Sequence, residues 1–258
     1  MNHEELLNAL KELKLNAIAR DFIEGAKVAE KRQLTFEQYL SGLIQTELNE
    51  RHAAKVKRFV KEASFPMIKT GEGFDFKKRT GITEQQFNRL SQGTFLKEAT
   101  NIMFFGDFSV GKTHLALALA NNLCQKGYRC LFAATNTLID QMILAKRNQT
   151  ILNLMKRLDR YDLIVCDELG YVPQEATGAD LFFQLISQRS ERKSLAITTN
   201  LTYSEWEKIF LNPLTTSAAV ERIIANCETF HVKGPSWRKE MAKKKLESLT
   251  VSQSETTT

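Results

Sequence analysis

The fold is decided by residues 101–113, which read NIMFFGDFSVGKT. The first five residues form an apolar strand pattern, and residues 106–113 match G-x-x-x-x-G-K-[ST] in full. Gly106 and Gly111 permit backbone conformations that are costly for other residues, so the loop can wrap around an anion. Its N–H groups and the start of the following helix would then point at phosphate oxygens. The stretch predicts a phosphate-binding loop between a buried strand and a helix.

Two side chains at the end of this loop carry the expected chemistry. Lys112 would place its positive charge against the β- and γ-phosphates of a nucleotide, and Thr113 would offer its hydroxyl to Mg²⁺. Ser109 occupies a position that is commonly glycine in related loops. We expect nucleotide contacts from Gly106, Asp107, Phe108, Ser109, Val110, Gly111, Lys112, Thr113 and His114. The predicted cofactors are therefore ATP and Mg²⁺.

A second apolar strand, residues 161–168 (YDLIVCDE), ends in two acids. Asp167 can hold the Mg²⁺ shell, and Glu168 can polarise a water for in-line attack on the γ-phosphate. Two solvated acids at a strand end are the alternative, and the loop upstream favours the functional interpretation. Asn200 follows another strand, where it could orient the attacking water or belong to a turn before the next helix.

Strands and helices alternate through the second half of the chain. Beyond the loop we expect strands at residues 129–134, 163–167, 194–199 and 229–232, with helices at 114–125, 137–158 and 180–190, the second of these broken near Asn148. Such alternation is typical of a parallel sheet that is covered on both faces. The predicted fold class is therefore α/β, with a parallel five-stranded sheet flanked by helices.

The first 65 residues are expected to form a small all-helical domain. Residues 3–31 show a helical pattern, with Leu6, Leu10, Leu13 and Ala17 on one face. Thr35 and Gln38 form a capping-box pattern that begins a second helix, which would run to about Ala63. The buried face of that second helix is predicted to consist of Phe36, Leu40, Leu43, Ile44 and Leu48.

Between the two predicted domains lies a stretch with turn-forming residues. Pro66, Gly71 and Gly73 interrupt the pattern, and a capping box at Thr83 begins a short helix that stops near Gly93. The expected organisation is a helical DNA- or partner-binding domain at residues 1–65, a linker and short helix at 66–98, an α/β domain at 99–247, and a disordered polar tail at 248–258.

The net charge and the composition limit the possible classes of function but do not identify one. Lys and Arg number 36 against 30 Asp and Glu in 258 residues, so the net charge of +6 permits an anionic partner. The four cysteines lack metal-ligand spacing and are interpreted as buried, reduced thiols. No apolar run is long enough to span a bilayer and the N-terminus is charged and amphipathic, so we expect a cytoplasmic protein with no membrane contact.

Basic residues cluster at several places that could contact a phosphate backbone. Arg51, Lys55 and Arg58 share one helical face, with a solvated helix surface as the alternative. Lys146 and Arg147 form another cluster before the acidic strand. Residues 77–79 and 243–245 are further basic runs. No aromatic-rich stacking platform accompanies them, so the predicted DNA binding is to the backbone, with little base readout.

Taken together, several motifs resemble those of IstB-type transposition helper ATPases. These are the loop followed by His-Leu-Ala, the DELGY run at residues 167–171, Thr-Asn-Leu at 199–201, and GPSWR at 234–238. The family comprises AAA+ proteins of bacterial insertion sequences and is close to the DnaC helicase loaders. The resemblance covers nearly the whole chain and implies an AAA+ P-loop fold for residues 99–247.

The resemblance also implies roles that the residues alone would not suggest. Arg222 would be an arginine finger that reaches the ATP site of a neighbouring subunit, and Arg238 would be a sensor arginine at the γ-phosphate of its own subunit. Lys146 and Arg147 would lie on an insert that lines a nucleic-acid path. The implied protein hydrolyses ATP, forms a homo-oligomer with ATP sites between subunits, binds duplex DNA, and recruits or stimulates an IstA-type transposase.

Two other functions remain as alternatives. A DnaC-like replicative helicase loader would keep the same ATPase core but use its N-terminal helices to bind a helicase. A small-molecule phosphotransferase would be a monomer whose turnover ignores DNA. Glu168 and the absence of an obvious acceptor-site motif count against the phosphotransferase.

Overall fold

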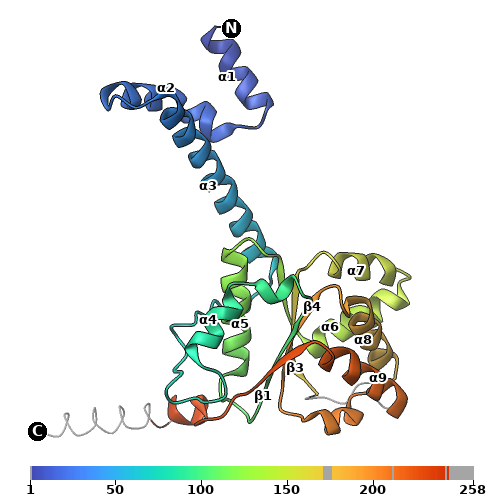
Figure 1. Ribbon diagram of the computed structural model, residues 1–258. Coiled ribbons are helices and arrows are strands. Elements are labelled where there is room, and N and C mark those ends of the chain that lie inside the picture. The colour runs from blue at the N-terminus through green and yellow to red at the C-terminus, as the bar shows by residue number, and fades with distance from the viewer. Residues whose placement is uncertain (1, 171–175, 211, 242, 244–258) are drawn as a thin grey trace, which may run out of the picture. The chain divides into compact units, whose positions relative to one another are not determined.

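The computed structural model describes residues 2–170, 176–210, 212–241 and 243 (Figure 1). The chain divides into two compact units, Met1–Arg58 and Phe59–Thr258. This boundary lies earlier than the expected one at residues 65 and 66, and residues 66–98 belong to the second unit. The expected disordered tail, residues 248–258, lies outside the described residues.

The first unit is helical and contains α1 (His3–Glu12), α2 (Asn16–Lys31) and most of α3 (Phe36–Glu62). The prediction of one continuous helical pattern over residues 3–31 is wrong at its centre. Lys14 adopts a positive φ of 57°, and the amide of Leu15 donates to the Leu10 carbonyl at 2.8 Å, so the chain turns between α1 and α2. Leu13 consequently lies on the surface rather than on a shared apolar face.

The buried carboxylate of Glu47 replaces a local cap at the start of α2. Leu15, at the N-cap, provides no side-chain hydrogen bond to the helix. Glu47 on α3 instead accepts hydrogen bonds from the amides of Ala17 at 2.8 Å and Ile18 at 3.3 Å. A carboxylate at this position satisfies free N–H groups and complements the helix dipole. The contact therefore ties α2 to α3.

The expected cap of α3 is confirmed, but its expected buried face is wrong except at Leu43. Thr35 and Gln38 exchange hydrogen bonds of 2.9 and 3.2 Å. Leu43 is 8% exposed, whereas Phe36 is 94% exposed. Leu40, Ile44 and Leu48 are also exposed. The helix contacts α2 along a different line, where Tyr39 donates to the Phe22 carbonyl at 2.7 Å.

The second unit is built on a five-stranded parallel sheet of order β2-β3-β4-β1-β5. Its strands are β1 (Asn101–Phe105), β2 (Cys130–Ala134), β3 (Leu163–Leu169), β4 (Ser194–Thr199) and β5 (Cys227–His231). All four pairings are parallel, which confirms the predicted sheet. Because the carboxyl ends of parallel strands meet at one edge, the ends of β1, β3 and β4 come together there.

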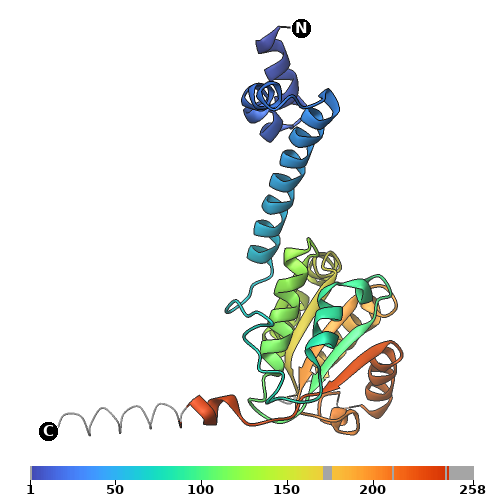
Figure 2. The ribbon, with the colours of Figure 1, turned by 60° about the vertical axis from the view of Figure 1, so that its left-hand side comes forward.

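Helices cover both faces of the sheet, as predicted (Figures 1 and 2). Side chains of a strand alternate between faces, so Ile102 and Phe104 join one core and Met103 joins the other. The first core includes α4 (Glu84–Ser91) and α5 (Lys112–Gln125). The second includes α6 (Thr135–Arg147), α7 (Ile151–Leu158), α8 (Ala176–Arg189) and α9 (Pro213–Ile224). The described part of this unit also contains two short 3₁₀ helices, Thr94–Leu96 and Tyr203–Lys208.

Residues 66–80, expected as a linker, pack against the rest of the second unit and are called the strap below. Phe74 and Arg79 are buried. The backbone of Thr80 pairs with Lys233, with N–H to carbonyl distances of 2.9 and 3.0 Å. The turn-forming residues of this stretch therefore produce an irregular but fixed segment. The capping box at Thr83 and the helix that follows it are confirmed.

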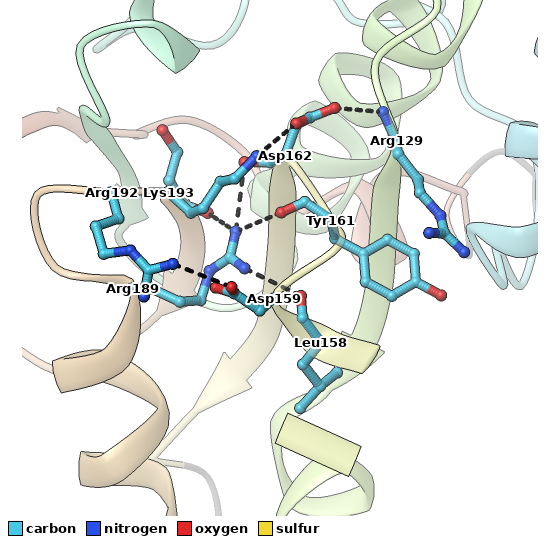
Figure 3. Close-up of polar contacts among 9 residues, drawn as sticks. Arg129, Leu158, Asp159, Tyr161, Asp162, Arg189, Arg192 and Lys193 are labelled. Atoms are coloured by element: carbon cyan, nitrogen blue, oxygen red, sulfur yellow. Dashed lines mark hydrogen bonds and ion pairs between the residues drawn. The ribbon is translucent and has the colours of Figure 1, made fainter. Parts of the chain in front are cut away.

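Arg189, at the end of α8, holds together the edge of the sheet at which β3 and β4 begin (Figure 3). Its guanidinium donates to the carbonyls of Leu158 at 3.1 Å, Tyr161 at 3.0 Å, Asp162 at 3.3 Å and Ser194 at 2.9 Å. Burial lowers its pKa to about 10, so the group stays charged at neutral pH. Four carbonyl contacts offset the cost of burying that charge.

Three of the four cysteines, Cys124, Cys130 and Cys166, are buried free thiols, as expected, and Cys227 is half-buried and also free. No helix within the described residues is both long and apolar enough to cross a bilayer.

The Arg189 network generates a stability prediction. Arg189→Met leaves several buried carbonyls without a donor, so we expect a loss of about 3 kcal/mol, or roughly 6–12 °C in melting temperature. Arg192→Met is the matched control, because that arginine is exposed and makes one ion pair with Asp159 at 3.1 Å. Thermal unfolding followed by circular dichroism measures both. Equal melting temperatures for the two variants would contradict the role of Arg189.

Candidate active site

The loop between β1 and α5 has the backbone that the sequence predicts. A Cβ atom on Gly106, which has a φ of +145°, would lie 2.1 Å from the Val232 carbonyl oxygen. A Cβ atom on Gly111, at a φ of +104°, would lie 2.6 Å from the Phe74 ring. Ser109 adopts a φ of 61°, in the left-handed region that favours glycine. This conformation explains why glycine suits the position of Ser109.

The Lys112 side chain folds back onto the loop that precedes it. The side chain is 5% exposed, and its Nζ donates to the carbonyls of Gly106 at 2.8 Å and Asp107 at 2.7 Å. Burial lowers the pKa of this ammonium, while the nearby charges of Asp167, Asp107 and Glu168 oppose the shift. The carbonyls of Gly106 and Asp107 thus hold the Lys112 ammonium in place.

The Asp167 carboxylate joins three elements at the edge of the sheet. Its Oδ1 accepts hydrogen bonds from Thr113 Oγ1 on α5 at 2.9 Å and from Thr198 Oγ1 on β4 at 2.5 Å. Burial raises the pKa of Asp167, and the two hydroxyl donors counteract that rise. The predicted partners Thr113 and Asp167 are therefore in direct contact.

Thr198 was not identified from the sequence, which drew attention to Asn200 instead. Besides contacting Asp167, the Thr198 hydroxyl accepts the Glu168 N–H at 2.9 Å. The parallel pairing of β3 with β4 supplies the signal that could have revealed it, because it places the threonines at the end of β4 beside the acidic end of β3. Asn200 does not line the cavity described below, and its buried Oδ1 has no hydrogen-bond partner among the described residues.

Glu168 lies in a bulge of β3. The pairing with β4 shifts register between Cys166 and Leu169, and Glu168 takes a positive φ of 60°. A bulge re-aims a side chain, and non-glycine residues with such a φ cluster at functional sites. Here the bulge turns the Glu168 side chain outward while Asp167 stays buried. The two acids are thereby placed in different environments.

A cavity of about 540 Å³ is lined by residues of the phosphate loop and the strap, and by Trp237 and Arg238. This volume is typical of sites for small molecules. Six of the nine residues predicted to contact nucleotide line it: Phe108, Ser109, Gly111, Lys112, Thr113 and His114. Glu168 and Thr198 line it as well, together with Arg238. Val110 is instead buried in the core beneath the loop.

The strap closes this cavity through contacts with α5. The Nε2 atom of His114 lies 2.9 Å from the Thr70 carbonyl oxygen, and Asn121 donates to the Lys69 carbonyl at 3.3 Å. The Phe74 ring packs against His114, with 5.7 Å between ring centroids. Burial lowers the pKa of His114, which favours the neutral imidazole. The supposed linker therefore supplies one wall of the cavity.

Arg222 does not line this cavity. It lies on α9, donates to the Ala218 carbonyl at 3.1 Å, and places its guanidinium 5.0 Å from the centre of the Phe183 ring. Within one subunit, therefore, the structure brings Arg238 but not Arg222 to the loop.

The residues predicted to bind DNA lie in different surroundings. Arg51 donates to the buried Glu47 carboxylate at 2.7 Å and to the Lys14 carbonyl at 2.5 Å, so it supports the packing of the first unit. Lys55 and Arg58 are exposed on α3, and Lys146 and Arg147 are exposed in the last turn of α6. In the basic run at residues 77–79, Lys77 and Lys78 are exposed but Arg79 is buried.

The comparisons with known proteins identify the family. The model of the IstB-like ATP binding protein family matches residues 8–246. This chain belongs to that family. The IstB-like chain is 32% identical over 234 residues to an insertion-sequence ATP-binding protein of Sinorhizobium fredii, covering 90% of this chain and 78% of the relative. It is 31% identical over 235 residues to an IS21 ATP-binding protein of Pseudomonas aeruginosa, covering 91% and 88%.

Solved structures show the fold. The DnaI structure aligns with a TM-score of 0.53 at 18% identity, covering 65% of this IstB-like chain and 89% of that one. The DnaC helicase loader aligns at 0.52 and 23%, covering 58% and 87%. AMPPCP-bound DnaA from Aquifex aeolicus aligns at 0.54 and 17%, covering 71% and 56%. The predicted AAA+ P-loop fold is confirmed.

The role of Thr198 generates a binding prediction. Thr198→Val removes a donor to the Asp167 carboxylate, so the affinity for ATP in the presence of Mg²⁺ should fall about tenfold or more. Affinity for ATP in excess chelator should change little, because the loop is untouched. Thr198→Ser keeps the hydroxyl and should bind like the unaltered chain in calorimetric titrations. An equal loss with and without Mg²⁺ would contradict this role.

Proposed function

We propose that this IstB-like chain is an ATPase that acts as a DNA-binding regulator of transposition. The observation that carries the proposal is the contact of Thr113 with Asp167, with Glu168 directed into the same cavity as Lys112. Membership of an ATP-binding family and relatives named for insertion sequences support it. The substrate is ATP, and the products are ADP and phosphate.

The donor set at the loop suits Mg²⁺. Thr113 Oγ1 and the Asp167 carboxylate are hard oxygen donors, and Mg²⁺ in nucleotide sites uses one or two carboxylates together with substrate phosphates. The described residues contain no group of three His, Cys, Asp or Glu side chains able to hold a metal by themselves, which agrees with that mode. When bound, Mg²⁺ would neutralise charge on the β- and γ-phosphate oxygens.

The residues of the cavity have different roles in ATP binding and hydrolysis. Loop N–H groups and Lys112 hold the triphosphate, and the Glu168 carboxylate accepts a proton from the attacking water. The water oxygen bonds to the γ-phosphorus while the bond from phosphorus to the β,γ-bridging oxygen breaks, which releases ADP. Asn200 follows β4 outside the lining of this cavity, so it is given no role in this step. Arg238 stabilises negative charge on the transferred phosphoryl group from within the same cavity.

Arg222 fits a role between subunits. It is exposed on α9 and does not line the cavity of its own subunit. We infer that it reaches the ATP site of a neighbouring copy as an arginine finger, so that the working form is a homo-oligomer with ATP at the subunit boundary. ATP binding would then favour assembly, and hydrolysis would reset it.

The nucleic-acid partner is duplex DNA, bound through exposed basic side chains that contact phosphates. The relevant positions are Lys55, Arg58, Lys146 and Arg147. The assembled ATPase would recruit or stimulate an IstA-type transposase. A DnaC-like helicase loader is the second candidate, because the solved DnaC loader shares the fold. The family match begins within α1, includes all of α2 and α3, and favours transposition.

Glu168→Gln tests the assignment of the base. The variant should bind ATP with unchanged affinity and remain assembled on DNA, while hydrolysis falls by about 100-fold or more. Phosphate release and particle size, measured with and without duplex DNA, check both parts. Lys112→Ala is the companion variant and should lose ATP binding itself. Rapid hydrolysis by Glu168→Gln would refute its role.

The DNA surfaces are tested by paired charge reversals that leave Arg51 intact. Lys146→Glu with Arg147→Glu, and separately Lys55→Glu with Arg58→Glu, should weaken duplex binding and reduce the salt-dependence slope by about 2. Lys97→Glu with Lys126→Glu makes the same change in net charge at other exposed positions and is the control. Fluorescence anisotropy across a salt series measures all three. Identical slopes in every variant would exclude these surfaces.

A further inference from the structure

Arg79 is a buried cation outside the phosphate loop, and it lines the same cavity as Arg238. It belongs to the strap and is 2% exposed. Its Nη2 donates to the Glu240 carboxylate at 2.8 Å and to the Pro235 carbonyl at 3.5 Å. The guanidinium carbon lies 5.3 Å from the centre of the Trp237 ring, a cation–π distance. All three partners belong to residues 233–241, called the C-terminal segment below.

The backbones of the strap and the C-terminal segment also meet. Thr80 and Lys233 exchange hydrogen bonds of 2.9 and 3.0 Å. Gly234 has a φ of +147°, and a Cβ atom there would lie 2.9 Å from both Arg79 Cγ and the Lys78 carbonyl oxygen. The approach is therefore too close for any other residue at position 234. The strap and the C-terminal segment are joined by backbone pairing as well as by the Arg79 side chain.

The C-terminal segment in turn contacts the phosphate loop. The Trp237 N–H donates to the Ser109 carbonyl at 2.9 Å, and the next residue, Arg238, lines the cavity. Residues 237–241 are helical, and the Glu240 N–H donates to the Ser236 carbonyl at 3.0 Å. Arg79 therefore holds the residues on both sides of Arg238, namely Trp237 and Glu240.

We propose that Arg79 is a positioning residue that acts through Arg238. By holding Trp237 and Glu240 it directs Arg238 into the cavity, so the strap and the C-terminal segment act on ATP as one unit. A buried cation is stable only when it is paired, so the Glu240 contact is required for this arrangement. The inference rests on the proposed function, in which Arg238 stabilises the transferred phosphoryl group.

The first test compares Arg79→Met with Arg238→Ala. If Arg79 acts through Arg238, each variant should lower ATP turnover about tenfold to 100-fold and leave ADP affinity within about threefold. The double variant should be no slower than the slower single variant, because both changes remove one interaction. Equal losses of ATP and ADP affinity, or multiplied losses of turnover in the double variant, would overturn the proposal.

The second test removes the charge at the other end of the pair, on the half-buried Glu240, and thermal unfolding checks that the variant stays folded. Glu240→Gln removes the negative charge that pairs with Arg79 and should reproduce the turnover loss. Glu228→Gln is the matched control, because Glu228 is 29% exposed against 30% for Glu240 and also pairs with an arginine, Arg89. Normal turnover in Glu240→Gln, or the same loss in Glu228→Gln, would overturn the proposal.

Lys112→Ala separates this inference from the proposed function. If that variant binds and hydrolyses ATP like the unaltered chain, the site assignment itself fails. If Lys112→Ala loses ATP binding while Arg79→Met and Glu240→Gln turn over ATP normally, only the role of Arg79 fails.

Discussion

The site depends on one buried carboxylate and the two hydroxyls that donate to it. Asp167 lies near the C-terminal end of β3, Thr113 lies in the first turn of α5, and Thr198 lies on β4. Because the carboxylate is buried, its charge is costly without these donors. The parallel register places the three groups at one edge, and the bulge after Cys166 sends Glu168 outward toward the cavity. The two adjacent acids therefore lie in different environments.

The walls of the cavity come from segments that are far apart in the sequence. The strap contacts α5 through His114 and Asn121 and contacts the C-terminal segment through Arg79. The C-terminal segment returns to the phosphate loop through Trp237. A displacement of one wall would therefore change the contacts of the other walls. Within the second unit, this arrangement joins the strap, the phosphate loop and the C-terminal segment through direct contacts.

Local chemistry made the sheet and the loop predictable, whereas tertiary contacts decided the rest. The G-x-x-x-x-G-K-[ST] pattern, the capping boxes and the apolar strands are local signals, and the structure confirms them. The turn at Lys14, the exposed face around Phe36 and the fixed strap depend on which elements pack together. Thr198 was missed for the same reason, since its hydroxyl acquires meaning only beside Asp167. Periodicity along one helix cannot reveal such neighbours.

The most direct test is a crystal structure of the chain with Mg²⁺ and a non-hydrolysable ATP analogue. We expect a metal ion on the Thr113 hydroxyl beside the Asp167 carboxylate, with the terminal phosphate between Lys112 and Glu168. A triphosphate bound away from the loop, or a metal ion remote from Asp167, would contradict it.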